Sequence, residues 1–192
     1  SSKASEIRKF AQSPTKFAQT TQPIGIDFII VPIVSSERRK YIPIGFINED
    51  IITNNAVQII PKATIYDFGI LTSNVHMAWV RVFAGRLKSD YRYSKDIVYN
   101  NFPWPNPNEK QKEKIEKTAQ MILDSRAKYP NSSLADLYDE LTMPPELRKA
   151  HQQNDIAVME AYGFDWRNMT ESDCVSKLME MYQELINQES NN

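Results

Sequence analysis

Three charged residues alternate along one short stretch of this chain: Lys88, Asp90 and Arg92. In an extended backbone, side chains repeat every second residue on one face, so these three would form a row with Tyr91 and Tyr93 turned the other way. A row made of a donor, an acceptor and a forked donor suits the reading of base edges in DNA. A solvated loop whose charges have no function is an equally good interpretation of the same residues.

The segments before this stretch predict strands. Two short apolar runs rich in β-branched residues, 25–34 and 41–47, indicate a β-hairpin, and the polar turn between them carries Arg38, Arg39 and Lys40. A basic hairpin tip can hold a phosphate, and a solvated turn is the alternative interpretation of these three charges.

Two more extended segments are predicted at 51–60 and 63–70. Asn54 and Asn55 interrupt the first one. Two Asn inside an apolar run are costly unless they lie at a bulge or face a partner, and a turn between two short strands would explain them equally well. From Leu71 the apolar residues change to helical spacing, which predicts a helix before Gly85.

The second half predicts helices alone, after an extended, proline-rich connector at 96–107. We therefore expect an α+β fold: a β-rich domain with one or more helices, followed by an all-α bundle. The predicted boundaries are residues 1–22 for an arm from an upstream domain, 23–105 for the β-rich domain and 106–192 for the helical domain. The start of the chain has neither an initiator Met nor a signal-peptide pattern, so we expect it to be part of a longer protein.

Charge separates the two halves as clearly as periodicity does. Residues 1–105 contain 13 Lys or Arg against 8 Asp or Glu, a net charge of +5, whereas residues 106–192 contain 10 against 16, a net charge of −6. Phosphate binding depends on local positive potential and not on the total charge of −1. The first half could therefore contact DNA, and the second half is a poor candidate for it.

The sequence shows no catalytic motif. It lacks a glycine-rich nucleotide loop, a His-Glu-x-x-His zinc motif and a plausible metal site, and His76, His151 and Cys174 are expected to pack in the core. We expect no cofactor in this chain. A single Cys cannot form an internal disulfide, which fits a cytoplasmic protein, and no apolar run is long enough to predict a membrane span.

Several contiguous strings resemble one family. They are Val31-Pro-Ile-Val-Ser-Ser-Glu-Arg-Arg39, Tyr41-Ile-Pro-Ile-Gly-Phe46, Phe68-Gly-Ile-Leu-Thr-Ser73, His76-Met-Ala-Trp79, Gly85-Arg-Leu-Lys-Ser-Asp-Tyr-Arg-Tyr-Ser94, Asn101-Phe-Pro-Trp-Pro105, Ser133-Leu-Ala-Asp-Leu-Tyr138, Met143-Pro144, Ala150-His151, Asn154-Asp155 and Ala161-Tyr-Gly163. Together they resemble the target-recognition region and the C-terminal helical region of MmeI-like restriction–modification enzymes, over nearly the whole chain beyond residue 20.

The resemblance implies a role in choosing the DNA sequence. It implies double-stranded DNA as partner, together with an upstream adenine-specific methyltransferase domain that uses S-adenosylmethionine, and a nuclease domain in the same long polypeptide. Base-reading positions of the family match Asn55 and Ala56 in one segment and Lys88, Ser89, Asp90 and Arg92 in another.

Phosphate contacts are expected from basic residues near these positions. The candidates are Arg38, Arg39, Lys40, Arg81 and Arg86. The alternative function is a protein–protein module, in which the acidic helical half docks onto the methyltransferase and the β-rich half is a scaffold. The full recognition site, and whether the parent cleaves DNA or only methylates it, do not follow from the sequence.

Overall fold

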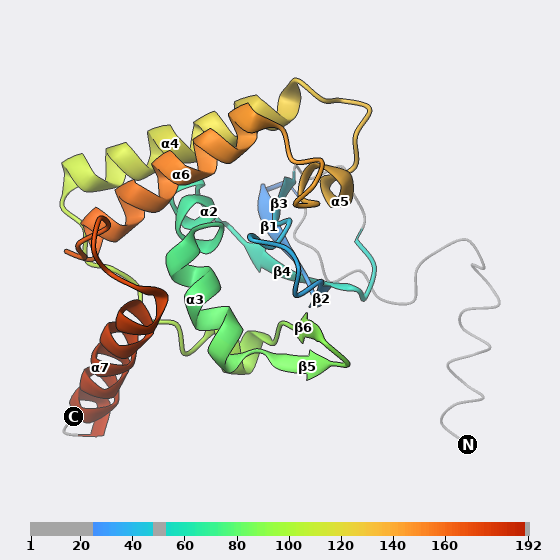
Figure 1. Ribbon diagram of the computed structural model, residues 1–192. Helices are drawn as coiled ribbons and strands as arrows, with labels where there is room; N and C mark the ends of the chain where they lie inside the picture. Colours follow the sequence, from blue (N-terminus) through green and yellow to red (C-terminus); the bar gives the residue numbers. More distant parts are fainter. Residues whose placement is uncertain (1–24, 48–52, 191–192) are drawn as a thin grey trace, which may run out of the picture.

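The computed structural model describes residues 25–47 and 53–190, and it contains helices and two small antiparallel sheets (Figure 1). The α+β fold class expected from the sequence is confirmed. The first sheet has the order β3-β1-β4, from β1 (Phe28–Pro32), β3 (Gly45–Ile47) and β4 (Val57–Pro61). The predicted pairing of the first two runs is confirmed, since Phe28 lies opposite Ile47 and Ile30 opposite Gly45.

The second sheet is built on a continuation of the same strand. After a bend at Ile33, the chain forms β2 (Val34–Ser35), which pairs with β6 (Asp90–Arg92), and β6 pairs with β5 (Gly85–Leu87). The basic segment 36–40 therefore connects the two sheets and is not the tip of a simple hairpin.

Two helices lie between the sheets in sequence. The expected strand over 63–70 is wrong, because helix α2 (Ile65–Leu71) occupies this segment. Its start is a capping box: the Asp67 amide donates to the Thr64 hydroxyl at 3.2 Å, and the Asp67 carboxylate accepts from the Thr64 amide at 2.7 Å. This local signature outweighs the β-forming Thr, Ile and Tyr residues around it. Helix α3 (Asn74–Phe83), capped by Ser73, confirms the predicted helix before Gly85.

The connector is less extended than expected. A single turn of π-helix, η1 (Lys95–Tyr99), interrupts it, and the indole of the buried Trp79 on α3 donates to the Val98 carbonyl at 3.1 Å. Beyond it the prediction of an all-helical half is confirmed, with α4 (Glu109–Ala127), α5 (Leu134–Leu137), α6 (Pro145–Ala161) and α7 (Glu171–Ser190).

The helices of the second half pack on α2 and α3 of the first. Figure 1 shows α4 and α6 side by side, with α2 beneath them and α7 alongside α3. Gly69 permits the close approach of α2 to α4, because a Cβ at this position would lie 2.6 Å from the Ile115 side chain. One hydrophobic core runs through both halves, and it includes Ile29, Trp79, Ile122 and Leu178. The predicted boundary at 105/106 is thus crossed by tight packing and remains a prediction.

Candidate nucleic-acid interface

The β5–β6 hairpin presents its charged residues outward. Leu87 pairs with Asp90, so Lys88 and Ser89 form a two-residue turn. Side chains alternate along β6: Tyr91 is buried, whereas Asp90 is half-buried and Arg92 is exposed on the opposite face. The alternation expected from the sequence is therefore present in this strand, and the packed tyrosine fixes which face looks outward.

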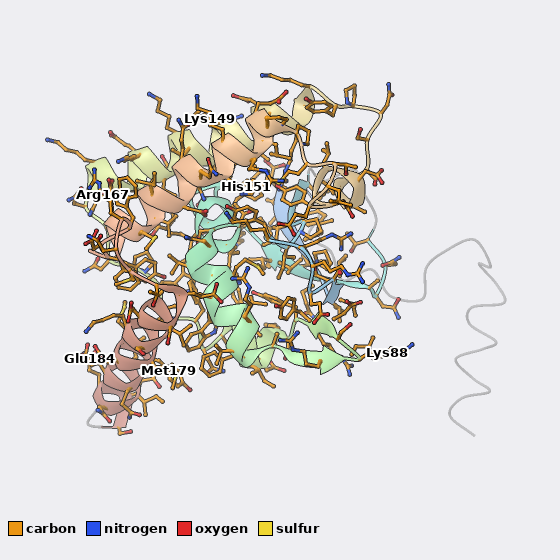
Figure 2. All side chains as sticks on the ribbon, in the orientation of Figure 1. Lys88, Lys149, His151, Arg167, Met179 and Glu184 are labelled. Atoms are coloured by element: carbon orange, nitrogen blue, oxygen red, sulfur yellow. The ribbon has the colours of Figure 1, made fainter. Side chains whose placement is uncertain are left out.

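Lys88 does not extend this row. Its φ of 57° places it in the left-handed region at the first turn position, so the expectation of an extended Lys88 is wrong. A two-residue hairpin turn requires positive φ because only then does its twist match that of the flanking strands. The conformation costs a non-glycine residue roughly 1 kcal/mol. Figure 2 shows the Lys88 side chain projecting beyond the tip of the hairpin.

The charges of the hairpin have few internal partners. Within the described part of the chain, neither Lys88 nor Arg92 takes part in a side-chain hydrogen bond or ion pair. The Asp90 carboxylate accepts one long bond, 3.4 Å, from the Glu37 amide and makes no ion pair with a described residue. These groups are therefore free to bind something outside the chain.

A polar cavity of 340 Å³ lies beside the hairpin. It combines the basic segment after β2 with the hairpin turn and with the loop after α5. Its lining residues are Ser36, Glu37, Arg38, Arg39, Ser89, Asp90, Asp139 and Glu140. Two arginines thus line one concavity with four acidic residues, Asp90 among them, although the three segments are far apart in sequence.

The second predicted base-reading segment is a turn. The Asn54 Oδ1 atom accepts from the Ala56 amide at 2.9 Å, which is an Asx-turn, and β4 begins at the next residue. The structure thus shows a turn at the Asn pair, and a DNA contact of Asn55 stays a prediction. Residues 51 and 52 of the predicted strand lie outside the described residues. Asn55 and Ala56 are both exposed.

Ile33 brings the two segments together. Its amide donates to the Ala56 carbonyl at 2.9 Å, and its carbonyl accepts from the Tyr93 amide at 2.8 Å. Ala56 and Tyr93 are therefore at most two strand spacings apart, roughly 10 Å. This distance corresponds to about three base-pair steps of duplex DNA. No sequence pattern indicates this link, because the hydrogen bonds connect residues that are distant in the chain.

Two of the predicted phosphate-binding arginines are engaged internally. The Arg81 guanidinium donates to Glu171 on α7 at 2.8 Å and to the Lys40 carbonyl at 3.3 Å. The Arg86 guanidinium lies over the Tyr91 ring, 4.2 Å from its centroid, and donates to the Ser89 carbonyl at 2.9 Å. Arg86 therefore stabilises the hairpin turn on the face of the sheet that carries Tyr91.

The other three basic residues belong to the segment that lines or borders the cavity. Arg38 and Lys40 are exposed and Arg39 is half-buried. None of the three forms an ion pair with a described residue.

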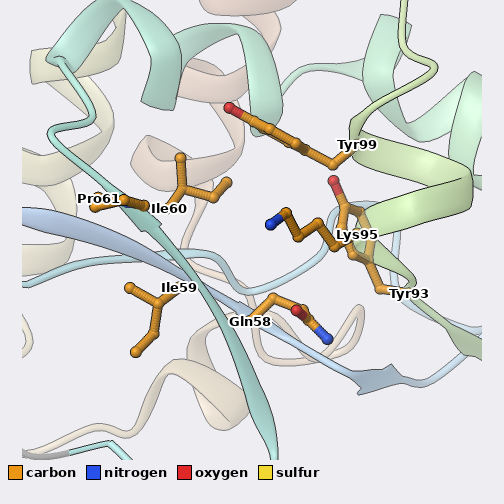
Figure 3. Close-up of a pocket in the computed structure, with 7 residues that line it drawn as sticks. All are labelled: Gln58, Ile59, Ile60, Pro61, Tyr93, Lys95 and Tyr99. Atoms are coloured by element: carbon orange, nitrogen blue, oxygen red, sulfur yellow. The ribbon is translucent and has the colours of Figure 1, made fainter. Parts of the chain in front are cut away.

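A second cavity, of 280 Å³, lies between β4 and the segment that follows β6 into η1 (Figure 3). Side chains of β4 form one wall, and Tyr93, Lys95 and Tyr99 form the other. The lining is mostly apolar, and the exposed Lys95 reaches across it in Figure 3.

A buried polar cluster lies next to the basic segment, at Tyr41, the residue that follows it. The Tyr41 hydroxyl donates to Asp155 Oδ2 on α6 at 2.6 Å, and the other oxygen of Asp155 accepts from the Asn74 amide at 2.8 Å. Burial raises the pKa of Asp155 to about 6, against the lowering effect of these two bonds. No local pattern indicates this contact, since 114 residues separate the two partners.

Arg126 anchors the same cluster from α4. Its Nη1 donates to the Ile44 carbonyl at 2.8 Å, and its Nε donates to the Tyr138 hydroxyl at 2.9 Å. Tyr138 also bonds His151 Nε2 at 2.6 Å, and the ring of His151 stacks on Tyr41 at 4.1 Å. Burial lowers the pKa of His151 well below its usual value, so the ring is neutral near pH 7.

The residues expected to pack in the core do so. His76, His151 and Cys174 are buried, and burial lowers the pKa of His76 to about 3 and raises that of Cys174 to about 12. Over residues 25–47 and 53–190, no cluster of three or more acidic, His or Cys side chains is placed to hold a metal ion. None of the helices described there has the length and apolarity needed to cross a membrane.

Family models match the chain in two consecutive parts. Residues 1–106 match the target recognition domain of MmeI, and residues 107–189 match the MmeI C-terminal domain. The chain belongs to the family of MmeI target recognition domains. The resemblance noted in the sequence is thereby confirmed.

Two relatives extend this family assignment. DNA methyltransferase A of Bacillus subtilis (strain 168) is 43% identical over 179 residues, which are 92% of this chain and 20% of that protein. A solved structure of the Type IIL restriction–modification enzyme MmeI in complex with DNA is 48% identical, with a TM-score of 0.85, and the match covers 95% of this chain and 24% of that one. This MmeI-family chain thus spans about a fifth to a quarter of the length of these relatives.

Proposed function

We propose that this chain recognises a specific sequence in double-stranded DNA on behalf of a restriction–modification DNA methyltransferase. One observation carries the proposal: Asp90 and Arg92 point outward from a β-hairpin without internal ion pairs among the described residues, and the turn at Asn55 and Ala56 lies at most about 10 Å from the same strand. The family assignment and the DNA complex of a relative support it.

The major groove of B-DNA fits this hairpin. It admits a two-stranded β-ribbon, and each base pair presents there its own pattern of donors and acceptors. Lys88 at the turn donates to the O6 or N7 of a guanine, and Asp90 accepts from the N4 amine of the paired cytosine. An exposed carboxylate is otherwise repelled by phosphates, so a base amine is its natural partner in DNA. A good paired contact of this kind discriminates by about 1–3 kcal/mol.

The remaining base-reading positions have simpler roles in this proposal. Arg92 donates to the N7 acceptor of a purine, and Asn55 has the amide group that pairs with the N6 and N7 atoms of adenine. Ala56 and Ser89 are small and exposed, so they allow close approach of the bases to the backbone.

Phosphate contacts come from the basic segment between the sheets. Arg38, Arg39 and Lys40 fix the register of the hairpin on the duplex without reading sequence. Arg81 is paired with Glu171 and positions the basic segment, and Arg86 stacks on the Tyr91 ring and positions the hairpin turn. In this proposal neither of them is a main phosphate contact.

The chemistry belongs to the rest of the parent protein. In this proposal an upstream domain of the same polypeptide transfers a methyl group from S-adenosylmethionine to adenine, in the cytoplasm, and a nuclease domain is a further expected part. The present chain is divided near residue 105 into a recognition domain and a helical domain that supports it.

An exchange of charges across the turn tests the base assignment. Lys88→Glu combined with Asp90→Arg in the full-length enzyme should move the preference at one position of the recognition site from G toward C. Mapping of methylated adenines in DNA exposed to each enzyme reads the site directly. Lys62→Glu is the control, because Lys62 is also exposed with a φ of 57° but lies at the end of β4 away from the turn. An unchanged recognition site in the double variant would refute the assignment.

Docking of the helical half onto the methyltransferase domain is a second candidate function. Helix α7 is acidic and leaves Met179, Leu185 and Ile186 partly exposed, which suits a protein surface better than DNA. If this is the main function, Met179→Glu should weaken association with the methyltransferase domain, while binding of the isolated chain to duplex DNA should be negligible even at low salt. Binding of labelled duplex that weakens steeply with salt would favour DNA recognition.

A further inference from the structure

The outward face of the small sheet carries two aliphatic side chains in register with the charged ones. Leu87 pairs with Asp90, and Val34 pairs with Arg92. Because paired residues in an antiparallel ladder point to the same side, all four side chains share one face. Leu87 is 50% exposed and Val34 is 39% exposed.

Packing within the chain does not account for these two residues. The opposite face of the same sheet is already covered, since Tyr91 and Ser35 are buried there. Single exposed aliphatic residues are common on protein surfaces and by themselves mean little. Here, however, both lie beside the residues that the proposed function places against the bases, so an apolar group of the DNA would meet them.

Thymine supplies the one apolar group of the major groove. Its C5-methyl group distinguishes it from cytosine and from both purines, and aliphatic side chains are its usual contacts. The Cβ atoms of directly paired residues lie roughly 5 Å apart. Neighbouring base pairs are separated by about 3.4 Å. A Leu87 side chain next to Asp90 therefore reaches a base pair adjoining the one that Asp90 reads.

We propose that Leu87 and Val34 are additional specificity-determining residues that contact thymine methyl groups in the recognised site. Leu87 contacts a thymine adjacent to the base pair read by Asp90, and Val34 contacts one adjacent to the base read by Arg92. This inference rests on the proposed function, and it extends the reading face from charged contacts to apolar ones.

Removal of single methyl groups from the DNA tests the inference. In duplexes carrying the mapped site, each thymine is replaced in turn by deoxyuridine, which differs from it only by the methyl group. Burial of one methyl-sized group is worth roughly a fourfold change in affinity. We therefore expect deoxyuridine at two positions, one for Leu87 and one for Val34, to weaken binding of the full-length enzyme about fourfold each.

The matching protein variants identify the contact. Leu87→Ala and Leu87→Asn should bind the thymine duplex about fourfold more weakly and should lose all sensitivity to deoxyuridine at one of these positions. Val34→Ala should do the same at a different thymine. Met121→Ala should keep the wild-type response at every position, because Met121 is 37% exposed on α4, away from the small sheet.

Two results would overturn the inference. One is a wild-type enzyme that is insensitive to deoxyuridine at every thymine, and the other is a sensitivity that Leu87→Ala and Val34→Ala leave unchanged. Neither result would contradict the proposed function, because the exchange of charges at Lys88 and Asp90 tests DNA recognition separately. The exposure of both aliphatic side chains means that the variants should keep the wild-type unfolding midpoint.

Discussion

The β5–β6 hairpin and the buried cluster between the two halves use polar residues in opposite ways. In the hairpin, Asp90 and Arg92 face outward, and no ion pair with a described residue holds them. In the cluster, Arg126 and Asp155 are almost fully buried, and each bonds atoms from the other half of the chain. A buried polar group is costly unless every bond is made, whereas an exposed one keeps its water until a ligand replaces it. Stability and recognition should therefore respond to different substitutions.

Loss of Arg126 should have the largest effect on stability. Arg126→Ala removes the donors to the Ile44 carbonyl and the Tyr138 hydroxyl in a buried site, at a cost of about 4 kcal/mol in unfolding free energy. Urea unfolding of this chain measures it, with Lys149→Ala on the exposed side of α6 as the control. If stability and recognition depend on different residues, full-length Arg126→Ala enzyme that remains folded should methylate the same DNA site as the wild type. A changed site would show that the cluster also takes part in recognition.

Asp155 gives the cluster a pH dependence. Its pKa is raised to about 6 when folded, against an ordinary value near 4, so the folded protein holds this proton up to higher pH than the unfolded chain. The carboxyl therefore favours folding below pH 4, and this contribution is lost as the pH rises to 6, by up to about 3 kcal/mol.

Replacement by a neutral amide isolates this effect. The unfolding free energy of Asp155→Asn minus that of the wild type should increase between pH 4 and pH 7. The buried His76 and His151, whose lowered pKa values destabilise the fold as the pH falls below about 6.5, are present in both proteins and cancel in the difference. A difference that is flat with pH would mean that Asp155 is already ionised throughout this range.

The basic segment should affect affinity without affecting the sequence read. Arg38→Ala combined with Arg39→Ala should weaken binding of the full-length enzyme to all duplexes alike. It should also lower the slope of log affinity against log salt by roughly two, one for each lost phosphate contact. Titration of labelled duplex between about 50 and 200 mM salt gives the slope. A change in base preference at any position would instead place one of these arginines against a base.

Substitution of Lys88 in the hairpin turn should change stability by less than the substitutions at Arg126 and Asp155. It should also separate the contribution of Lys88 to stability from its contribution to base reading. Lys88→Gly removes the strain of a positive φ and should raise the unfolding free energy by about 1 kcal/mol. It should also relax the preference for G at the position assigned to Lys88. Lys62→Gly, at the same φ of 57°, should give the same gain in stability with unchanged preference. Equal preference in both variants would exclude Lys88 from base reading.

The features that could be predicted from the sequence are those that depend on residues close together in the chain. The alternation of Asp90, Tyr91 and Arg92 follows from the two-residue period of a strand, and the caps at Ser73 and Asn108 follow from their side-chain oxygens. The capping box at Thr64 and Asp67 was also readable, and the β-branched residues around it led to the wrong prediction of a strand. Lys88 was misplaced because spacing alone does not show where a hairpin turns.

Contacts between distant residues were decided only by the tertiary structure. The bonds of Ile33 to Ala56 and Tyr93, and of Tyr41 to Asp155, join residues 23 to 114 positions apart. No local periodicity contains them, because they exist only when the core shared by the two halves has formed. The sequence determined which residue types could read DNA, and the packing of the helices against the sheets decided which of them lie together and face outward.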